Sequence, residues 1–298
     1  MSPDPSIPLA DGSLSLDSLT DPVVIDPDPP LLDAAVDAYC DAYPTVADPD
    51  LDALRGEGLD EPTPEVSGAD ATLTVLAAPD AIDGVTGGFH AESRLAALTE
   101  TGLLDLSTLD DPQPNAVLAA RETACVLVES PPSETNESGR DDARRRIGDD
   151  PALYDRYADT VESADSWRPR TPSRWQVYDG FDERCTGAVA ADVIRLFDAD
   201  PDLSGDDVVD PRIRAYVVGA RHGVLDHDLR RACEDAGLGS PSTFTGVKRR
   251  LIAADLVRTE RVPQPVGRPR ERIVAEPNLA DPPLSAVAEA VQDALERE

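Results

Sequence analysis

Residues 216–262 read YVVGARHGVLDHDLRRACEDAGLGSPSTFTGVKRRLIAADLVRTERV, and their pattern predicts closely spaced helices followed by a strand. A first helix is expected over about 211–221, where Pro211 stands at the start and apolar residues recur at helical spacing. A second helix follows, with Asp226 as its N-cap and Gly237 as the glycine just beyond its end. Both helices are short and amphipathic, as expected in a small helical domain.

A third helix and a hairpin complete this pattern. Ser240 and Pro241 are an N-cap serine and a first-turn proline, which predicts a helix over 240–254 after a tight turn. Leu256–Val262 and Arg270–Ala275 have strand character and flank a proline-rich loop at 263–270. Two helices, a turn, a third helix and a hairpin form the plan of a winged helix-turn-helix domain, which we assign to residues 209–275.

This plan suits duplex DNA. Phe244, Val247 and Leu251 are expected to face inward, so that the polar side chains of the third helix face a major groove. Pro269 favours an extended Arg268, which can enter a narrow minor groove. The expected DNA-binding residues are Ser240, Ser242, Thr243, Thr245, Lys248, Arg249, Arg268 and Arg270.

The distribution of charge supports the same partner. The chain has 298 residues with 59 Asp and Glu against 27 Lys and Arg, a net charge of −32, and Lys248 is its only lysine. Residues 1–139 carry a net −25, whereas residues 211–275 carry 13 basic and 7 acidic residues, a net +6. A basic block in so acidic a chain indicates a polyanionic partner, double-stranded DNA.

The overall acidity is typical of a halophilic, cytoplasmic protein. Carboxylates keep a surface hydrated in molar salt, and their repulsion is screened there because the Debye length falls to about 3 Å at 1 M. An acidic interaction protein at ordinary salt is the alternative. The chain has no apolar run long enough to span a membrane, and its four cysteines form no CxxC motif.

The rest of the chain predicts a fold of the α/β class, α+β overall. Val23–Ile25 and Ala71–Ala77 are strand candidates that alternate with helical patterns, and Val117–Ala120 with Ala124–Glu129 predicts a hairpin. The expected organisation is a flexible tail (1–20), an N-terminal α/β sensory or interaction domain (21–130), a helical connector (131–208), the winged domain (209–275) and a C-terminal helix (276–298).

Two further segments are candidate sites. Gly84, Thr86, Gly87 and Gly88 are expected in a loop after a strand and before a helix, where backbone N–H groups can hold a small anionic effector; an ordinary loop is the alternative. In the C-terminal helix, apolar residues near a/d spacing predict a homodimer interface, with docking onto the chain's own winged domain as the alternative. These residues are Leu284, Val287, Val291 and Leu295.

The residues from Pro211 to Pro277, together with FHAESRLAALTETGLLDL and NAVLAARETACVLVE, resemble haloarchaeal TbsP-like transcriptional regulators over about 20–298. The resemblance implies a DNA-binding regulator with a separate sensory or interaction domain, and it assigns no individual site residue.

Neither a catalytic set nor a cofactor site is expected. His222, His227 and Cys233 have spacings that place them on different helix faces, so no metal site is predicted. Two other functions stay open: an adaptor whose winged domain contacts proteins, and an enzyme with its active site at the 84–88 loop.

Overall fold

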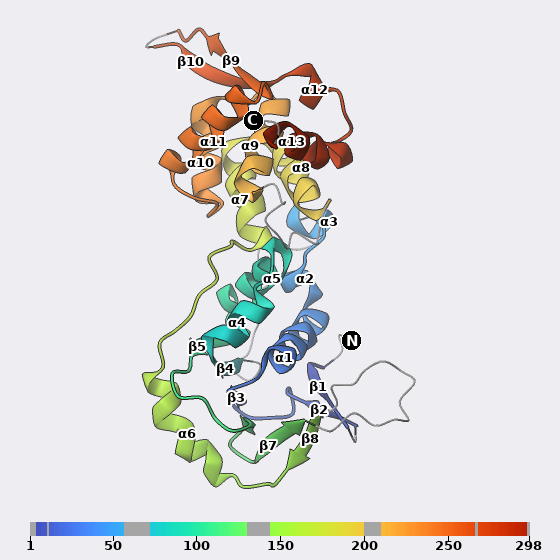
Figure 1. Ribbon diagram of the computed structural model, residues 1–298, viewed down its shortest axis with the longest axis vertical. Coiled ribbons are helices and arrows are strands. Elements are labelled where there is room, and N and C mark those ends of the chain that lie inside the picture. Colours follow the sequence, from blue (N-terminus) through green and yellow to red (C-terminus); the bar gives the residue numbers. More distant parts are fainter. Residues whose placement is uncertain are drawn as a thin grey trace. The chain divides into compact units, whose positions relative to one another are not determined.

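A computed structural model describes residues 4–10, 12–56, 72–129, 144–199, 210–265 and 268–296 (Figure 1). The chain forms two compact units. The N-terminal unit comprises residues 1–48, 63–87 and 94–170, and the C-terminal unit comprises residues 49–62, 88–93 and 171–298. The mixed α/β class expected from the sequence is confirmed.

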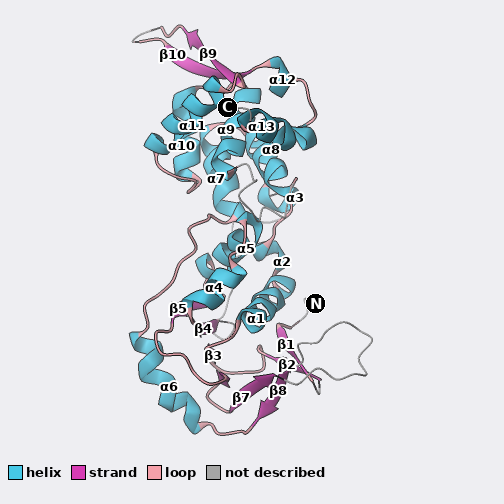
Figure 2. Ribbon diagram, in the orientation of Figure 1, coloured by secondary structure: helices cyan, strands magenta, loops and turns pink. Residues whose placement is uncertain are grey.

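A sheet in the order β2-β1-β8-β7-β6-β3-β4-β5 forms the N-terminal unit (Figure 2). Strands β3, β4 and β5 are parallel to one another, whereas β6 is antiparallel to β3 and β7 is antiparallel to both β6 and β8. The bounds are β1 Ser6–Leu9, β2 Gly12–Ser15, β3 Val23–Ile25, β4 Leu73–Ala77, β5 Leu104–Thr108, β6 Ala116–Ala119, β7 Ala124–Glu129 and β8 Arg144–Ile147.

Helices cover both faces of the central strands. Because side chains alternate along a strand, Val24 packs with α1 (Pro29–Ala42) and α4 (Pro79–Val85), whereas Val23 and Ile25 pack on the opposite face with α6 (Ala152–Ser163). The expected strand at Val23–Ile25 and the hairpin of β6 and β7 are confirmed. Short α2 (Pro44–Ala47) and longer α5 (Phe89–Glu100) complete the helices before β5.

Two expectations for this unit are wrong. Residues 1–20 are not simply a flexible tail, because β1 and β2 pair antiparallel and Ile7 and Leu16 are buried. The 84–88 segment is not a strand-to-helix loop either. Gly84 lies inside α4, where an added Cβ would come within 2.9 Å of Pro29 Cβ, and the Thr86 hydroxyl donates to the Ile82 carbonyl oxygen. Gly84 is explained by helix packing, and Thr86, Gly87 and Gly88 form the short turn between α4 and α5, so this segment lacks the strand-to-helix geometry on which the anion site was predicted.

The C-terminal unit is helical around one apolar core and carries a two-stranded hairpin. Helices α7 and α8 contribute to the same core as the winged elements, and β8 belongs to the N-terminal sheet; residues 131–208 are therefore not one helical connector. The bounds are α3 Leu51–Leu54, α7 Arg174–Arg184, α8 Gly187–Asp198, α9 Pro211–Arg221, α10 Asp226–Asp235, α11 Pro241–Ala253, β9 Val257–Val262, β10 Arg270–Ala275, α12 Pro277–Ala280 and α13 Val287–Leu295.

The apolar face of α13 is buried within its own unit. Val287 and Val291 are 0% and 1% exposed, and Leu284 and Leu295 pack against the same core. Val287 and Val291 are therefore occupied within their own unit, as the intramolecular alternative expects, whereas Leu284 and Leu295 remain partly exposed. Among the described residues, no helix has the length and apolar character needed to cross a bilayer.

Candidate nucleic-acid interface

The winged arrangement is built from α9, α10, α11 and the β9–β10 hairpin. The hairpin strands pair in register from Val257 with Ala275 to Val262 with Arg270. Leu225, just before α10, forms a β-bridge with Arg272, and the Ile273 N–H donates to the Val224 carbonyl oxygen at 3.0 Å. The wing is thus attached to the helices through backbone bonds.

The turn between α10 and α11 depends on two glycines with positive φ, Gly237 at +72° and Gly239 at +146°. Ser240 occupies the N-cap position as expected, but its hydroxyl lies 2.7 Å from Ser242 Oγ and 3.1 Å from Thr243 Oγ1 instead of capping the helix. The hydroxyls predicted to reach DNA from Ser240, Ser242 and Thr243 therefore form one cluster at the start of α11.

One face of α11 is buried and the opposite face is open. Phe244 and Leu251 are buried, and the Phe244 ring stacks on Tyr216 with centroids 5.9 Å apart. Arg249 and Arg250 are exposed, and neither forms an ion pair with a carboxylate of the described residues. The open face therefore presents two cations that can bind an external anion.

Gly246 lies on this same open face, one turn before Arg250. A Cβ added there would meet no atom within 4 Å, so packing inside the protein does not require glycine. Glycine in the middle of a helix lowers its stability by about 0.5–1 kcal/mol relative to alanine. A glycine that the fold does not need, on the exposed face, leaves room for a partner to approach the helix closely.

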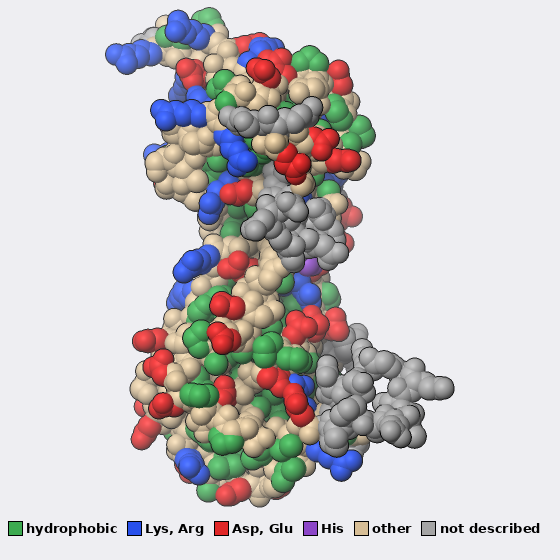
Figure 3. Space-filling model, in the orientation of Figure 1, with side chains coloured by type: hydrophobic (Ala, Val, Ile, Leu, Met, Phe, Trp, Pro, Cys, Tyr) green, Lys and Arg blue, Asp and Glu red, His purple; other side chains and the backbone are tan. Residues whose placement is uncertain are grey.

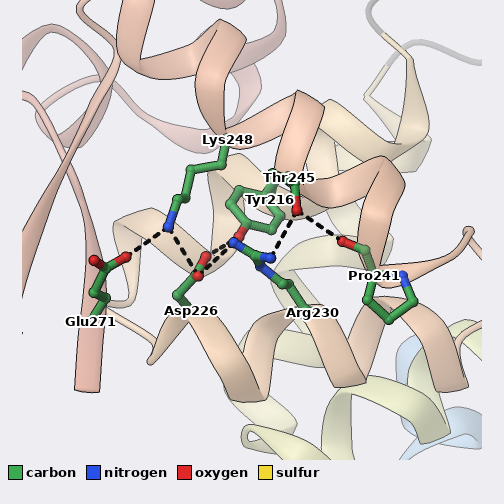
Figure 4. Close-up of polar contacts among 7 residues, drawn as sticks. All are labelled: Tyr216, Asp226, Arg230, Pro241, Thr245, Lys248 and Glu271. Atoms are coloured by element: carbon green, nitrogen blue, oxygen red, sulfur yellow. Dashed lines mark hydrogen bonds and ion pairs between the residues drawn. The ribbon is translucent and has the colours of Figure 1, made fainter. Parts of the chain in front are cut away.

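Asp226 is the centre of a buried polar network (Figure 4). It is the first residue of α10 rather than its N-cap, and its carboxylate accepts hydrogen bonds from Tyr216 Oη, from Arg230 Nη2 at 2.8 Å and from Lys248 Nζ at 3.0 Å. Burial acts to raise the pKa of Asp226, but the bonds from Tyr216 and Lys248 hold it below its usual range. The network joins α9, α10 and α11.

Two predicted DNA contacts are instead members of this network. Lys248 Nζ also donates to Glu271 Oε2 of β10 at 2.8 Å, and its side chain is only 13% exposed. The Thr245 hydroxyl accepts from Arg230 Nη1 at 2.9 Å and donates to the Pro241 carbonyl oxygen. Lys248 and Thr245 thus make contacts inside the domain. Helical periodicity did not predict this, because the side of α11 that faces α10 and the wing is polar.

The wing carries the remaining cations. Arg268 is exposed and forms no ion pair with the described residues, and Arg270 Nη1 lies 3.8 Å from Asp228 Oδ2. Arg261, directly opposite Glu271 in the hairpin, is also exposed. Figure 3 shows basic side chains gathered around this hairpin. The predicted DNA-binding set does not include Arg250 and Arg261, although both lie in the basic block that singled out this domain.

Histidine and cysteine do not form a site here. His222 Nε2 lies 2.8 Å from Asp192 Oδ2, His227 Nδ1 lies 3.0 Å from Asp228 Oδ1, and Cys233 is fully buried. Among the described residues, no three His, Cys, Asp or Glu side chains are grouped so that they could hold a metal ion.

Comparison with known proteins gives one match. A family model for the C-terminal helix-turn-helix domain of TbsP-like transcriptional regulators matches residues 173–292, which include α7 to α11 and the wing. No curated protein and no solved structure matches the chain. Residues 173–292 are therefore similar to the C-terminal helix-turn-helix domain of TbsP-like transcriptional regulators.

Proposed function

We propose that this regulator reads duplex DNA with the open face of α11 in the major groove and the tip of the wing in the minor groove. The observation that carries the proposal is that Arg249, Arg250 and Arg268 are exposed and unpaired among the described residues of a strongly acidic chain. Arginines with no partner of their own are available to phosphates and to guanine edges. The wing loop at 266–267 lies outside the described residues.

The proposed roles of the predicted residues differ. Ser240, Ser242 and Thr243 contact phosphates or base edges at the start of α11, and Arg270 supports the wing beside Asp228. Lys248 and Asp226 position α11 and the wing without touching DNA. This division follows from exposure, since only exposed donors can bind a duplex without first breaking internal bonds.

The salt concentration determines how much of the DNA affinity such arginines supply. Each phosphate contact releases counterions, and this contribution shrinks as salt rises. In the halophilic cytoplasm that we propose, base contacts, DNA shape and a two-fold homodimer would carry most of the specificity. The dimer surface is then one other than the buried face of α13.

The N-terminal unit is proposed to sense an effector or a partner. Its acidity also repels DNA, which leaves the basic domain as the one productive docking surface.

Chromatin immunoprecipitation with sequencing tests the proposal. The test variant is Arg249→Ala/Arg250→Ala/Arg268→Ala. The matched control is Arg184→Ala/Arg195→Ala/Arg231→Ala, which removes equal charge from arginines that already pair with Asp235, Asp192 and Glu234.

Discrete peaks that are lost in the test variant and kept in the control support direct reading of DNA. Peaks that persist in both variants indicate an adaptor recruited by other proteins. The absence of peaks from the wild-type protein would favour the enzyme alternative.

A further inference from the structure

The N-terminal unit contains a cavity of about 550 Å³ next to the ends of β3 and β4. Both strands end there and lead directly into helices, β3 into α1 and β4 into α4. On its other side β3 pairs with the antiparallel β6, so the strand arrangement changes at this point. In open α/β sheets, ligands bind beyond the carboxyl ends of parallel strands where the order of strands changes.

The walls of the cavity are suited to a small organic molecule. Its volume lies within the range of about 300–1,000 Å³ typical of small-molecule sites. The apolar surface comes mainly from short, rigid side chains, which cannot collapse to fill the space. These include Pro27, Pro29, Ala78, Ala81 and Pro114, and the larger Leu127 also lines the cavity.

A buried arginine from the sheet completes the lining. Arg144 of β8 is 5% exposed, and its Nη2 atom lies 2.5 Å from Asp28 Oδ1 and 4.0 Å from Glu129 Oε1. Asp28 also accepts from the Leu31 N–H as the N-cap of α1. Burial acts to raise the pKa of Asp28, but the hydrogen bonds from Arg144 and from the Leu31 N–H, with the positive charge of Arg144, together hold it below its usual range. A buried charge persists only when it is paired, so Arg144 is held mainly by Asp28 and only loosely, at 4.0 Å, by the exposed Glu129. Within the described part of the chain, Asp26 and Asp80 of the lining form no ion pair.

The lining disfavours phosphorylated ligands. The start of α1 has prolines at positions 29 and 30, which lack N–H groups, and the Asp28 carboxylate occupies the site that an anion would take. Among the described residues of the lining, Asp26, Asp80 and Glu129 add three further carboxylates against one cation, Arg144. The Gln113 N–H donates to Asp26, so one oxygen of that carboxylate is already satisfied. The polar groups that remain free in the lining are therefore mostly negatively charged hydrogen-bond acceptors.

We infer that this cavity is the effector site of the N-terminal unit, and that it binds a small organic cation with an aliphatic body. An ammonium or guanidinium group donates to Asp80 and Glu129, while the aliphatic part packs on the prolines and alanines. The inference rests on the proposed sensory role only where it calls the bound molecule a regulatory effector. Binding itself can be measured without DNA.

Three probes of equal chain length test the ligand class by titration calorimetry of the full chain in 2 M KCl. They are 1,5-diaminopentane, pentane-1,5-diol and glutarate, which present cationic, neutral and anionic ends. The expected result is saturable one-to-one binding of the diamine, about tenfold or more tighter than the diol, with no binding of glutarate.

Paired variants distinguish binding in the cavity from general attraction of a cation to an acidic surface. Asp80→Asn/Glu129→Gln should weaken diamine binding by about tenfold or more. Asp155→Asn/Asp159→Asn removes equal charge from α6, which does not line the cavity, and should leave binding unchanged. Equal losses in both variants, tightest binding of the diol or of glutarate, or no binding of the diamine would overturn the inference.

The two proposals fail independently. Loss of diamine binding would leave the arginine test of DNA recognition unaffected. Retention of DNA peaks in the arginine variant would equally leave a positive titration in place.

Discussion

The ammonium group of Lys248 lies 3.0 Å from the carboxylate of Asp226, inside the winged domain. The only lysine of the chain therefore links α11 to α10 and to the wing. The cations on the exposed face of α11 are the arginines Arg249 and Arg250. Because Lys248 is internal and the arginines are exposed, mutations of the two kinds of cation should have different effects.

Lys248→Met should lower the melting temperature and weaken DNA binding without changing its salt dependence. Arg249→Ala should instead lower the slope of log affinity against log salt by about 1, because one phosphate contact is lost, and should leave the melting temperature unchanged. Fluorescence anisotropy over a KCl series, with thermal melts of each variant, gives both quantities. A reduced slope for Lys248→Met with an unaltered melt would contradict the positioning role.

Asp226 should make the winged domain sensitive to acid. Because its pKa in the folded state is below the usual 3.8, its contribution to stability is present above that value and is lost as pH falls through the folded pKa. Asp226→Asn should cost on the order of 3 kcal/mol at neutral pH, since Lys248 and Arg230 lose their shared partner. The difference between wild type and variant in the free energy of unfolding should shrink below about pH 4. A difference that is constant from pH 7 to pH 3 would argue against this assignment.

Two glycines of the domain should respond oppositely to alanine. Gly246→Ala should stabilise the fold by about 0.5–1 kcal/mol, because the position is open and helical. Gly219→Ala should destabilise it by about 1–3 kcal/mol, because the new Cβ would come within 2.4 Å of Leu229 Cδ1.

A larger residue at position 246 tests the approach of DNA. Gly246→Leu should keep the melting temperature near wild type but reduce DNA affinity about tenfold or more. If Gly246→Leu binds DNA as well as wild type, the open face of α11 does not contact the duplex.

We expect α13 to stabilise the fold of its own unit. Val287→Asp places a carboxylate at a fully buried position, so it should lower the free energy of unfolding by several kcal/mol. The helix buries its apolar face in its own unit, so this loss should be the same at low and high protein concentration. Chemical denaturation across a hundredfold range of concentration, with light scattering on the native protein, decides between folding and dimerisation.

Stability should rise with salt. The net charge of −32 is concentrated in the N-terminal half, where residues 1–139 carry a net −25. Screening this repulsion should raise the melting temperature steadily from dilute buffer to molar KCl. A melting temperature that is independent of KCl would count against a halophilic protein.

The sequence predicted best those elements whose signal is local. Helical spacing located α9, α10 and α11, and two segments of strand character on either side of a proline-rich loop located the hairpin, because these signals lie within a single segment. Gly237, expected just beyond the end of α10, has a positive φ as such a helix end requires.

What the sequence did not predict depends on partners distant in the chain. Lys248 is 22 residues from Asp226 and 23 from Glu271, and nothing in the periodicity of α11 shows that these acids face it. Arg144 and Asp28 are separated by 116 residues, so neither indicated a cavity. The apolar stripe of α13 is compatible with either an intermolecular or an intramolecular partner, and only the three-dimensional packing decides between them.

The shared ammonium of Lys248 bears on the kind of DNA site that the proposed binding mode would favour. Glu271 on the wing and Asp226 on α10 hold one cation of α11 between them, so we expect the helix and the wing to keep a fixed spacing. Under the proposed binding mode, their two contact segments on the duplex would then also need a fixed spacing. Inserting one base pair between these segments would displace one of them by about 3.4 Å along the duplex, and such an insertion should therefore harm binding more than most base substitutions.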